Sequence, residues 1–249
     1  MIRRATWLFG LAAACLGAGG CSSMSMPTYG HKEKPLEIRW TSHVSLKDAG
    51  QLKNLDALLD RPPAGLAAGA KLTLVKADNP DVEAGATTCK QYLALKRLGY
   101  VFKTPEDNLV ESSFKAATLP LSMLAQASPS RSSYLKDFSL AREGVASLPA
   151  ALGLAGGEGD SAGKNRRWIE AFPGAAVQAI DADSAVITDE QTETRLTVLA
   201  FADFNHDGVE DVLLSVTNSS RTGPLKLFRY VVLTRKAEAE PLTVIREES

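Results

Sequence analysis

The stretch 195–216, RLTVLAFADFNHDGVEDVLLSV, contains the pattern that decides the fold. Two apolar runs rich in Val and Leu, 195–201 and 209–216, are separated by a short segment of Asp, Asn, His and Gly. Such runs are typical of β-strands, and a short polar connection containing Gly is typical of the turn between antiparallel neighbours. The stretch therefore predicts a β-hairpin.

Similar strand-like runs lie on both sides of this hairpin, and Asp, Asn, Ser and Gly occur in the connections between them. They cover residues 175–180, 184–187, 226–234 and 241–245. Runs joined by short polar turns pair in an antiparallel manner. We therefore expect the region 167–249 to form an antiparallel β-sheet.

The preceding region, 36–152, has the pattern of a helix-rich α+β segment. Strands are expected at 36–46 and 71–77, and helices at 45–60 and 88–98. Thr104, Pro105 and Asp107 predict the start of a further helix, which Pro120 is expected to end. Tyr134, Leu135 and Phe138 predict another amphipathic segment. The fold class is therefore α+β, with the helices packed on one face of the sheet or forming a neighbouring lobe.

A Gly-rich stretch, 153–166, separates the two regions and is expected to be a long loop. Its Gly163-Lys164 pair resembles part of a phosphate-binding loop, but Glu158 stands where that motif requires Gly. Asn165 follows the Lys, so the hydroxyl that would bind Mg²⁺ is missing. No nucleotide is expected here.

The composition of the 249 residues excludes several classes of protein. The chain has 28 Lys+Arg and 29 Asp+Glu, and a near-neutral balance gives no electrostatic attraction to nucleic acid. Three Cys cannot form a disulfide scaffold, and three His leave little scope for a His-based metal centre. One thiol, Cys89, lies on the same helical face as Tyr92 and Leu95. That spacing favours a buried core Cys over a catalytic or chain-linking one.

The N-terminus has the pattern of a secretory signal peptide. Arg3 and Arg4 precede an apolar run, Ala5 to Ala18, that would span about 21 Å as a helix. That length is too short to cross a bilayer, whose hydrocarbon core is about 30 Å thick. A basic start, a short apolar run and small residues before a break predict a secretory signal peptide.

The break itself, LGAGGCSS at 16–23, resembles the lipobox of bacterial lipoprotein precursors, although Ala18 stands where that family usually has Leu. The resemblance implies that Cys21 is acylated and becomes the first residue of a mature chain of 229 residues. Ser22 implies sorting to the outer membrane, with the protein facing the periplasm. A plain signal peptide cleaved nearby is the alternative. The polar segment 21–35 would then be a flexible tether between the lipid and the folded protein.

The hairpin connection Asp203–Asp211 carries the one motif with recognisable chemistry. Side-chain oxygens recur at alternate positions, from Asp203, Asn205 and Asp207, with Asp211 following and Gly208 permitting a sharp turn. The backbone carbonyl of Val209 would add another oxygen. Hard oxygen ligands in this number suit Ca²⁺ and not Zn²⁺.

This loop begins like an EF-hand, but Leu214 stands where that family has its bidentate Glu. It resembles more closely the calcium loops of FG-GAP and VCBS-type repeats, which join two strands. The resemblance covers about 20 residues and implies that Asp203, Asn205, Asp207 and Asp211 bind Ca²⁺, while His206 and Glu210 point outward. An Asx-rich turn that binds no metal is the alternative.

Known catalytic motifs give no candidate catalytic residue. Ser133-Tyr134-Leu135-Lys136 matches S-x-x-K, but the companion motifs are missing. The sequence therefore predicts a non-catalytic lipoprotein of the bacterial envelope with a structural Ca²⁺ loop and a binding or scaffolding role towards envelope protein or glycan. The alternative hypothesis is an envelope hydrolase acting on glycan or peptide.

Overall fold

The computed structural model describes residues 34–44, 46, 48–63, 66, 69–154 and 166–249. The expected signal peptide 1–20, Cys21, nearly all of the tether 21–35, and most of the Gly-rich loop 153–166 lie outside the described residues. The described residues belong to one unit, Lys34–Ser249, and the fold below refers to that unit alone.

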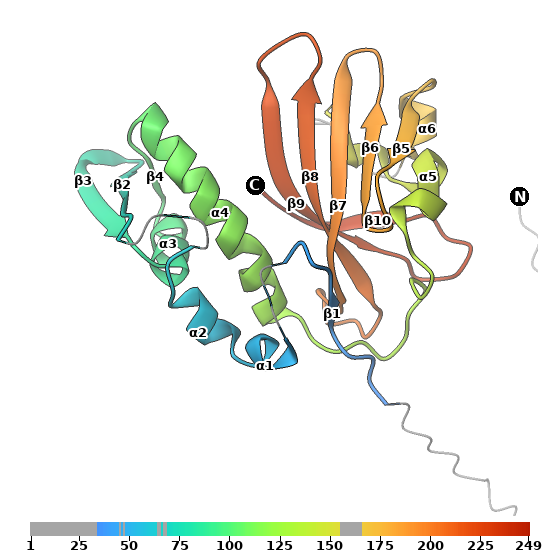
Figure 1. The fold of residues 1–249 in the computed structure, drawn as a ribbon, viewed down its shortest axis with the longest axis horizontal. Coiled ribbons are helices and arrows are strands. Elements are labelled where there is room, and N and C mark those ends of the chain that lie inside the picture. The colour runs from blue at the N-terminus through green and yellow to red at the C-terminus, as the bar shows by residue number, and fades with distance from the viewer. Residues whose placement is uncertain (1–33, 45, 47, 64–65, 67–68, 155–165) are drawn as a thin grey trace, which may run out of the picture. The chain divides into compact units, whose positions relative to one another are not determined.

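The main element is an antiparallel sheet in which consecutive strands lie side by side (Figure 1). Its strands are β5 (Ala176–Ala179), β6 (Ser184–Thr188), β7 (Thr192–Ala202), β8 (Asp211–Ser220), β9 (Lys226–Thr234) and β10 (Thr243–Glu248). A seventh strand, β1 (Arg39–Trp40), also pairs with β7. The predicted antiparallel sheet and the α+β class are therefore confirmed.

β1 can pair with β7 because β6 is too short to cover that strand completely. β6 reaches only from Glu193 to Thr197 along β7, which leaves the following residues free on that edge. Arg39 and Trp40 pair there with Phe201 and Ala200. The expected strand 36–46 is thus reduced to two residues, because only this short edge is available to it.

Both faces of the sheet are covered by other parts of the chain. Leu214 and Val231 face a core that also contains Leu140, Leu152 and Trp168 from α5 (Leu140–Ser147), the 3₁₀ turn Ala150–Leu152 and α6 (Trp168–Ala171). Leu213 and Val232 face a second core with residues of α2 (Leu55–Leu59) and α4 (Pro105–Gln126). Because both faces are buried, β8 and β9 contain unbroken apolar runs. The expectation that helices would pack on one face only was therefore wrong.

Helix α4 begins where the sequence predicts but does not end at Pro120. Thr104 and Asp107 form a complete capping box, with each side chain bonded to the backbone N–H of the other residue. The helix then continues past Pro120 to Gln126. Pro lacks the N–H that would bond the carbonyl of Ala116, and the Tyr230 hydroxyl of β9 donates to that carbonyl instead, at 3.1 Å.

The remaining elements form a small sheet, order β3-β2-β4, against α3 (Cys89–Arg97) and the first half of α4. Its strands are β2 (Leu72–Lys76), β3 (Asn79–Ala86) and β4 (Tyr100–Phe102), of which the sequence predicted β2 alone. The predicted helix 88–98 is confirmed, with Thr88 as its N-cap. The helix expected at 45–60 is broken into α1 (Ala49–Leu52) and α2. No helix forms around Tyr134–Phe138, where an irregular segment leads to the N-cap Ser139 of α5.

Candidate functional site

The Asp203–Glu210 loop joins the ends of β7 and β8, as the sequence predicts. Asp203 is 3% exposed and its carboxylate accepts two backbone hydrogen bonds, from Asp207 N–H at 3.2 Å and Gly208 N–H at 2.8 Å. Asn205 Oδ1 also accepts from Asp207 N–H, and Asp207 Oδ1 accepts from Val209 N–H. Backbone N–H groups of the loop therefore point inward, towards the side-chain oxygens of the first three predicted ligands.

The backbone of this loop adopts left-handed conformations at two positions. Gly208 has a φ of 89°, and His206 has a φ of 63°, which is unusual for a residue other than Gly. Gly208 is buried, and a Cβ atom there would lie 3.0 Å from the Arg131 Nε atom. The left-handed turn therefore favours Gly at position 208, and a larger residue there would also displace the Arg131 side chain.

Asp211 closes the loop from the first position of β8 and is fully buried. Its Oδ2 atom accepts from Phe204 N–H at 3.0 Å, whereas its Oδ1 atom is buried without a hydrogen-bond partner. Burial raises the pKa of Asp211 to about 6; Thr234 and the Phe204 N–H oppose this, and the Asp207 and Asp203 carboxylates add to it. The Thr234 hydroxyl is close enough to affect the pKa, but it too is left without a hydrogen bond. The carboxylate thus carries negative charge that the protein alone compensates poorly.

The donor set of this loop matches the chemistry of a calcium site. Three carboxylates and an amide come from Asp203, Asn205, Asp207 and Asp211, and an ionised carboxylate has lone pairs left after accepting an N–H bond. The unpartnered Asp211 Oδ1 is the kind of orphaned oxygen that a cation would satisfy. As the side chains stand, no group of three or more His, Cys, Asp and Glu among the described residues is gathered closely enough to hold a metal ion.

The loop is held from outside by the segment Ser128–Ser133, which follows α4. Ser128 and Asp203 exchange two backbone hydrogen bonds of 3.0 and 2.9 Å. Arg131 and Ser132 both donate their N–H groups to the Gly208 carbonyl, and Ser132 accepts from Glu210 N–H. The Ser128 hydroxyl also lies 3.1 Å from His206 Nδ1. This contact could not be predicted from local sequence, because it joins segments about 75 residues apart.

Glu210 does not point outward, which corrects the expectation drawn from the resemblance. It is 2% exposed, and its Oε2 atom accepts from the Ser133 hydroxyl at 2.6 Å and from Arg39 Nη2 at 3.0 Å. Arg39 Nε lies 3.4 Å from the other oxygen, so the ion pair is bidentate. Strand alternation could not have shown this, because Glu210 lies just before β8 and both faces of that strand are buried. His206, in contrast, is exposed as expected.

No known protein family, curated protein or solved structure matches the chain.

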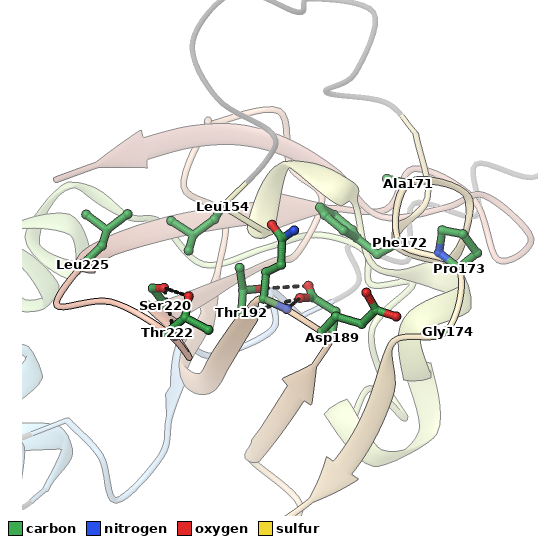
Figure 2. A pocket seen from close by; sticks show the side chains of 12 residues that line it. Leu154, Ala171, Phe172, Pro173, Gly174, Asp189, Thr192, Ser220, Thr222 and Leu225 are labelled. Atoms are coloured by element: carbon green, nitrogen blue, oxygen red, sulfur yellow. Dashed lines mark hydrogen bonds between the residues drawn. The ribbon is translucent and has the colours of Figure 1, made fainter.

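A cavity of about 890 Å³ lies at the other end of the sheet, beside the turns that precede β7 and follow β8 (Figure 2). Its described lining includes Phe172, Asp189, Thr192, Ser220 and Leu225. Burial opposes ionisation of Asp189, but hydrogen bonds from Thr192 and Gln191 and the charge of Arg221 outweigh it and lower the pKa. A general acid needs a raised pKa, so Asp189 is unsuited to that role, and its hydrogen bonds to Gln191 and Thr192 hold the turn.

Ser133 and Cys89 are the two remaining side chains with a reactive group that the sequence analysis singled out. The structure places each of them in a structural role. Ser133 and Lys136 line one small cavity of about 320 Å³, but the Ser133 hydroxyl donates to Glu210 and accepts from Leu135 N–H. Cys89 is buried and free, as predicted, and burial raises the pKa of its thiol. Among the described helices, none is long and apolar enough to cross a membrane.

Proposed function

We propose that the chain is a non-catalytic lipoprotein of the bacterial envelope, whose Asp203–Asp211 loop binds one structural Ca²⁺ ion. In this proposal Asp203, Asn205, Asp207, the Val209 carbonyl and Asp211 supply the oxygens. The likeness of the loop to FG-GAP and VCBS-type calcium loops supports the assignment. The observation that carries it is the fully buried Asp211 carboxylate, whose Oδ1 atom faces the Thr234 hydroxyl across the strand pair but forms no hydrogen bond of normal geometry.

The ion would stabilise the β7–β8 hairpin and would not act as a Lewis acid. Its ligands would come almost entirely from the protein, whereas a catalytic metal keeps an open position for substrate. The stabilised body would then present a binding or scaffolding surface to other envelope components, with acylated Cys21 attaching it to the outer membrane through the polar segment 21–35.

Calcium binding is tested by isothermal titration calorimetry of the purified full chain and of Asp207→Ala. Asp207 is the partly exposed ligand, so its removal disturbs the fold less than removal of buried Asp203. We expect one site per chain with a Kd of about 10⁻⁴ M, as in extracellular modules, and at least about tenfold weaker binding in the variant. Asp189→Ala is the matched control, because it removes an Asx turn at the opposite end of β7. Equal binding by the wild type and Asp207→Ala would refute the assignment.

Lipidation is tested separately by growing a Gram-negative host that expresses the full chain with radiolabelled palmitate. We expect label on the wild-type protein and none on Cys21→Ser, because the acyl chains require the Cys21 amine and thiol. Label that persists in Cys21→Ser, or none on the wild type, would contradict the anchor.

A further inference from the structure

The segment Leu36–Thr41, near the start of the described residues, lies directly against the candidate calcium loop. Arg39 of β1 forms its bidentate ion pair with Glu210, which is the residue just before Asp211. The Arg39 guanidinium carbon also lies 4.3 Å from the centroid of the Phe201 ring, two residues before Asp203. One exposed side chain of β1 therefore contacts both ends of the loop.

Backbone contacts join the same two parts of the chain. Leu36 N–H donates to the Ser130 carbonyl at 2.7 Å, and Ser130 belongs to the segment that holds the loop. Thr41 N–H donates to the Leu199 carbonyl at 2.9 Å on the free edge of β7. Leu36–Thr41 thus rests on Ser128–Ser133, on the end of β7 and on Glu210.

Apolar burial adds little more to these contacts, because Ile38 and Trp40 pack against the second core but are only partly buried. β1 contains two residues, and none of residues 34–41 is buried. Segments with few buried side chains open at low free energy. Its attachment therefore depends in part on Glu210 and on Ser130, and the hydrogen bonds between the loop and Ser128–Ser133 hold both in place.

We propose that Ca²⁺ in the Asp203–Asp211 loop locks Leu36–Thr41 onto the body through the Arg39–Glu210 ion pair. This inference rests on the proposed calcium site. An ion that binds only the folded conformation of the loop stabilises that conformation. It therefore also stabilises the contacts that the folded loop makes with Leu36–Thr41. Release of the ion would free about six residues, which adds about 20 Å of extended chain between the body and residue 35. Calcium would then set the reach of the segment that connects the body to the membrane.

Hydrogen exchange with mass spectrometry on the purified full chain tests the proposal. The peptide covering residues 35–42 contains the donors Leu36 and Thr41, and the peptide covering 189–192 contains the donors Gln191 and Thr192 as an internal control. With Ca²⁺ at about ten times the Kd, we expect exchange of the first peptide to slow about tenfold and the second to change less than twofold. Arg39→Gln, which changes the half-exposed partner, and Glu210→Gln should each reduce the effect on 35–42 to less than threefold.

Calorimetry on the same samples separates failure of this inference from failure of the proposed function. Arg39→Gln should bind Ca²⁺ within about threefold of the wild type, because Arg39 supplies no ligand. Calcium binding with less than a twofold change at 35–42, or a full effect that survives in both variants, would overturn the inference alone. Absence of calcium binding by the wild type would overturn the proposed function and this inference with it.

Discussion

Adjacent residues at the start of β8 have opposite roles. Glu210 carries a buried carboxylate whose charge is matched by Arg39 and by the Ser133 hydroxyl. Asp211 carries a buried carboxylate with one oxygen unpartnered and two other acidic side chains near it. Side chains of neighbouring strand residues point to opposite faces, so the two groups meet different surroundings. The first is satisfied by the protein, and the second keeps one oxygen without a hydrogen bond.

The buried thiol of Cys89 leads to a prediction about its reactivity. Its side chain is 2% exposed, and burial raises the pKa of the thiol, so little reactive thiolate reaches the solvent at pH 8. We expect iodoacetamide to modify the Cys89 peptide of the native chain more than about tenfold more slowly than in 8 M urea. A Cys placed at the exposed Ser112 of α4 is the control and should react at similar rates in both conditions. Equal rates at Cys89 would contradict burial.

Single residues were predictable where their neighbours along the chain determine them. Thr104 and Asp107 cap helix α4 through bonds of short sequence separation, and the sequence indicated both. Asp203, Asn205 and Asp207 likewise bond within their own loop. Arg39 and Ser133 were missed because their partner, Glu210, lies 171 and 77 residues away. The residues around Arg39 and Ser133 give no indication that either side chain will pair with Glu210.

At the scale of elements, α4 shows how a tertiary contact overrides a local rule. Pro120 should interrupt the helix because it removes a hydrogen bond to the Ala116 carbonyl. The Tyr230 hydroxyl replaces the missing donor, and Leu121, Met123 and Leu124 beyond the Pro are buried against the sheet. Packing of the last turns therefore outweighs the local cost, and the helix extends to Gln126.

A double-mutant cycle tests this explanation. Tyr230→Phe should lower the free energy of unfolding by about 1 kcal/mol, the value of one hydrogen bond. In a Pro120→Ala background the helix regains its own N–H donor, so we expect Tyr230→Phe to cost at least about 0.5 kcal/mol less. Urea unfolding followed by circular dichroism gives the four free energies. Strictly additive effects would show that Tyr230 does not substitute for the missing N–H.

Strands were predicted well where they are long and apolar, and poorly where they are short and polar. β7, β8 and β9 are near-continuous apolar runs because both of their faces are buried. β3 has the sequence NPDVEAGA and forms because β2 offers it a pairing partner. β4 has only three residues and also forms by pairing with β2, so the sequence did not predict it. Whether such short strands form depends on pairing with a neighbouring strand, and that pairing cannot be seen in the sequence.

At the scale of the whole molecule, the large sheet connects two ends with different chemistry. The end with the Asp203–Asp211 loop receives the N-terminal segment and the Ser128–Ser133 connection. The other end has the turn held by Asp189 and the cavity beside it. We expect loss of calcium to affect the first end and to leave the turn at Asp189 unchanged, because separate sets of hydrogen bonds hold the two turns.

Thermal unfolding of the full chain with and without calcium tests the central claim most directly. At 1 mM Ca²⁺ and a Kd near 10⁻⁴ M, binding should stabilise the native state by about 1.4 kcal/mol. For a chain of this size that raises the Tm by about 4 °C. Asp189→Ala should have a lower Tm in both conditions but keep the calcium-dependent rise, whereas Asp207→Ala should lose it. No rise in the wild type, or an equal rise in Asp207→Ala, would contradict the account.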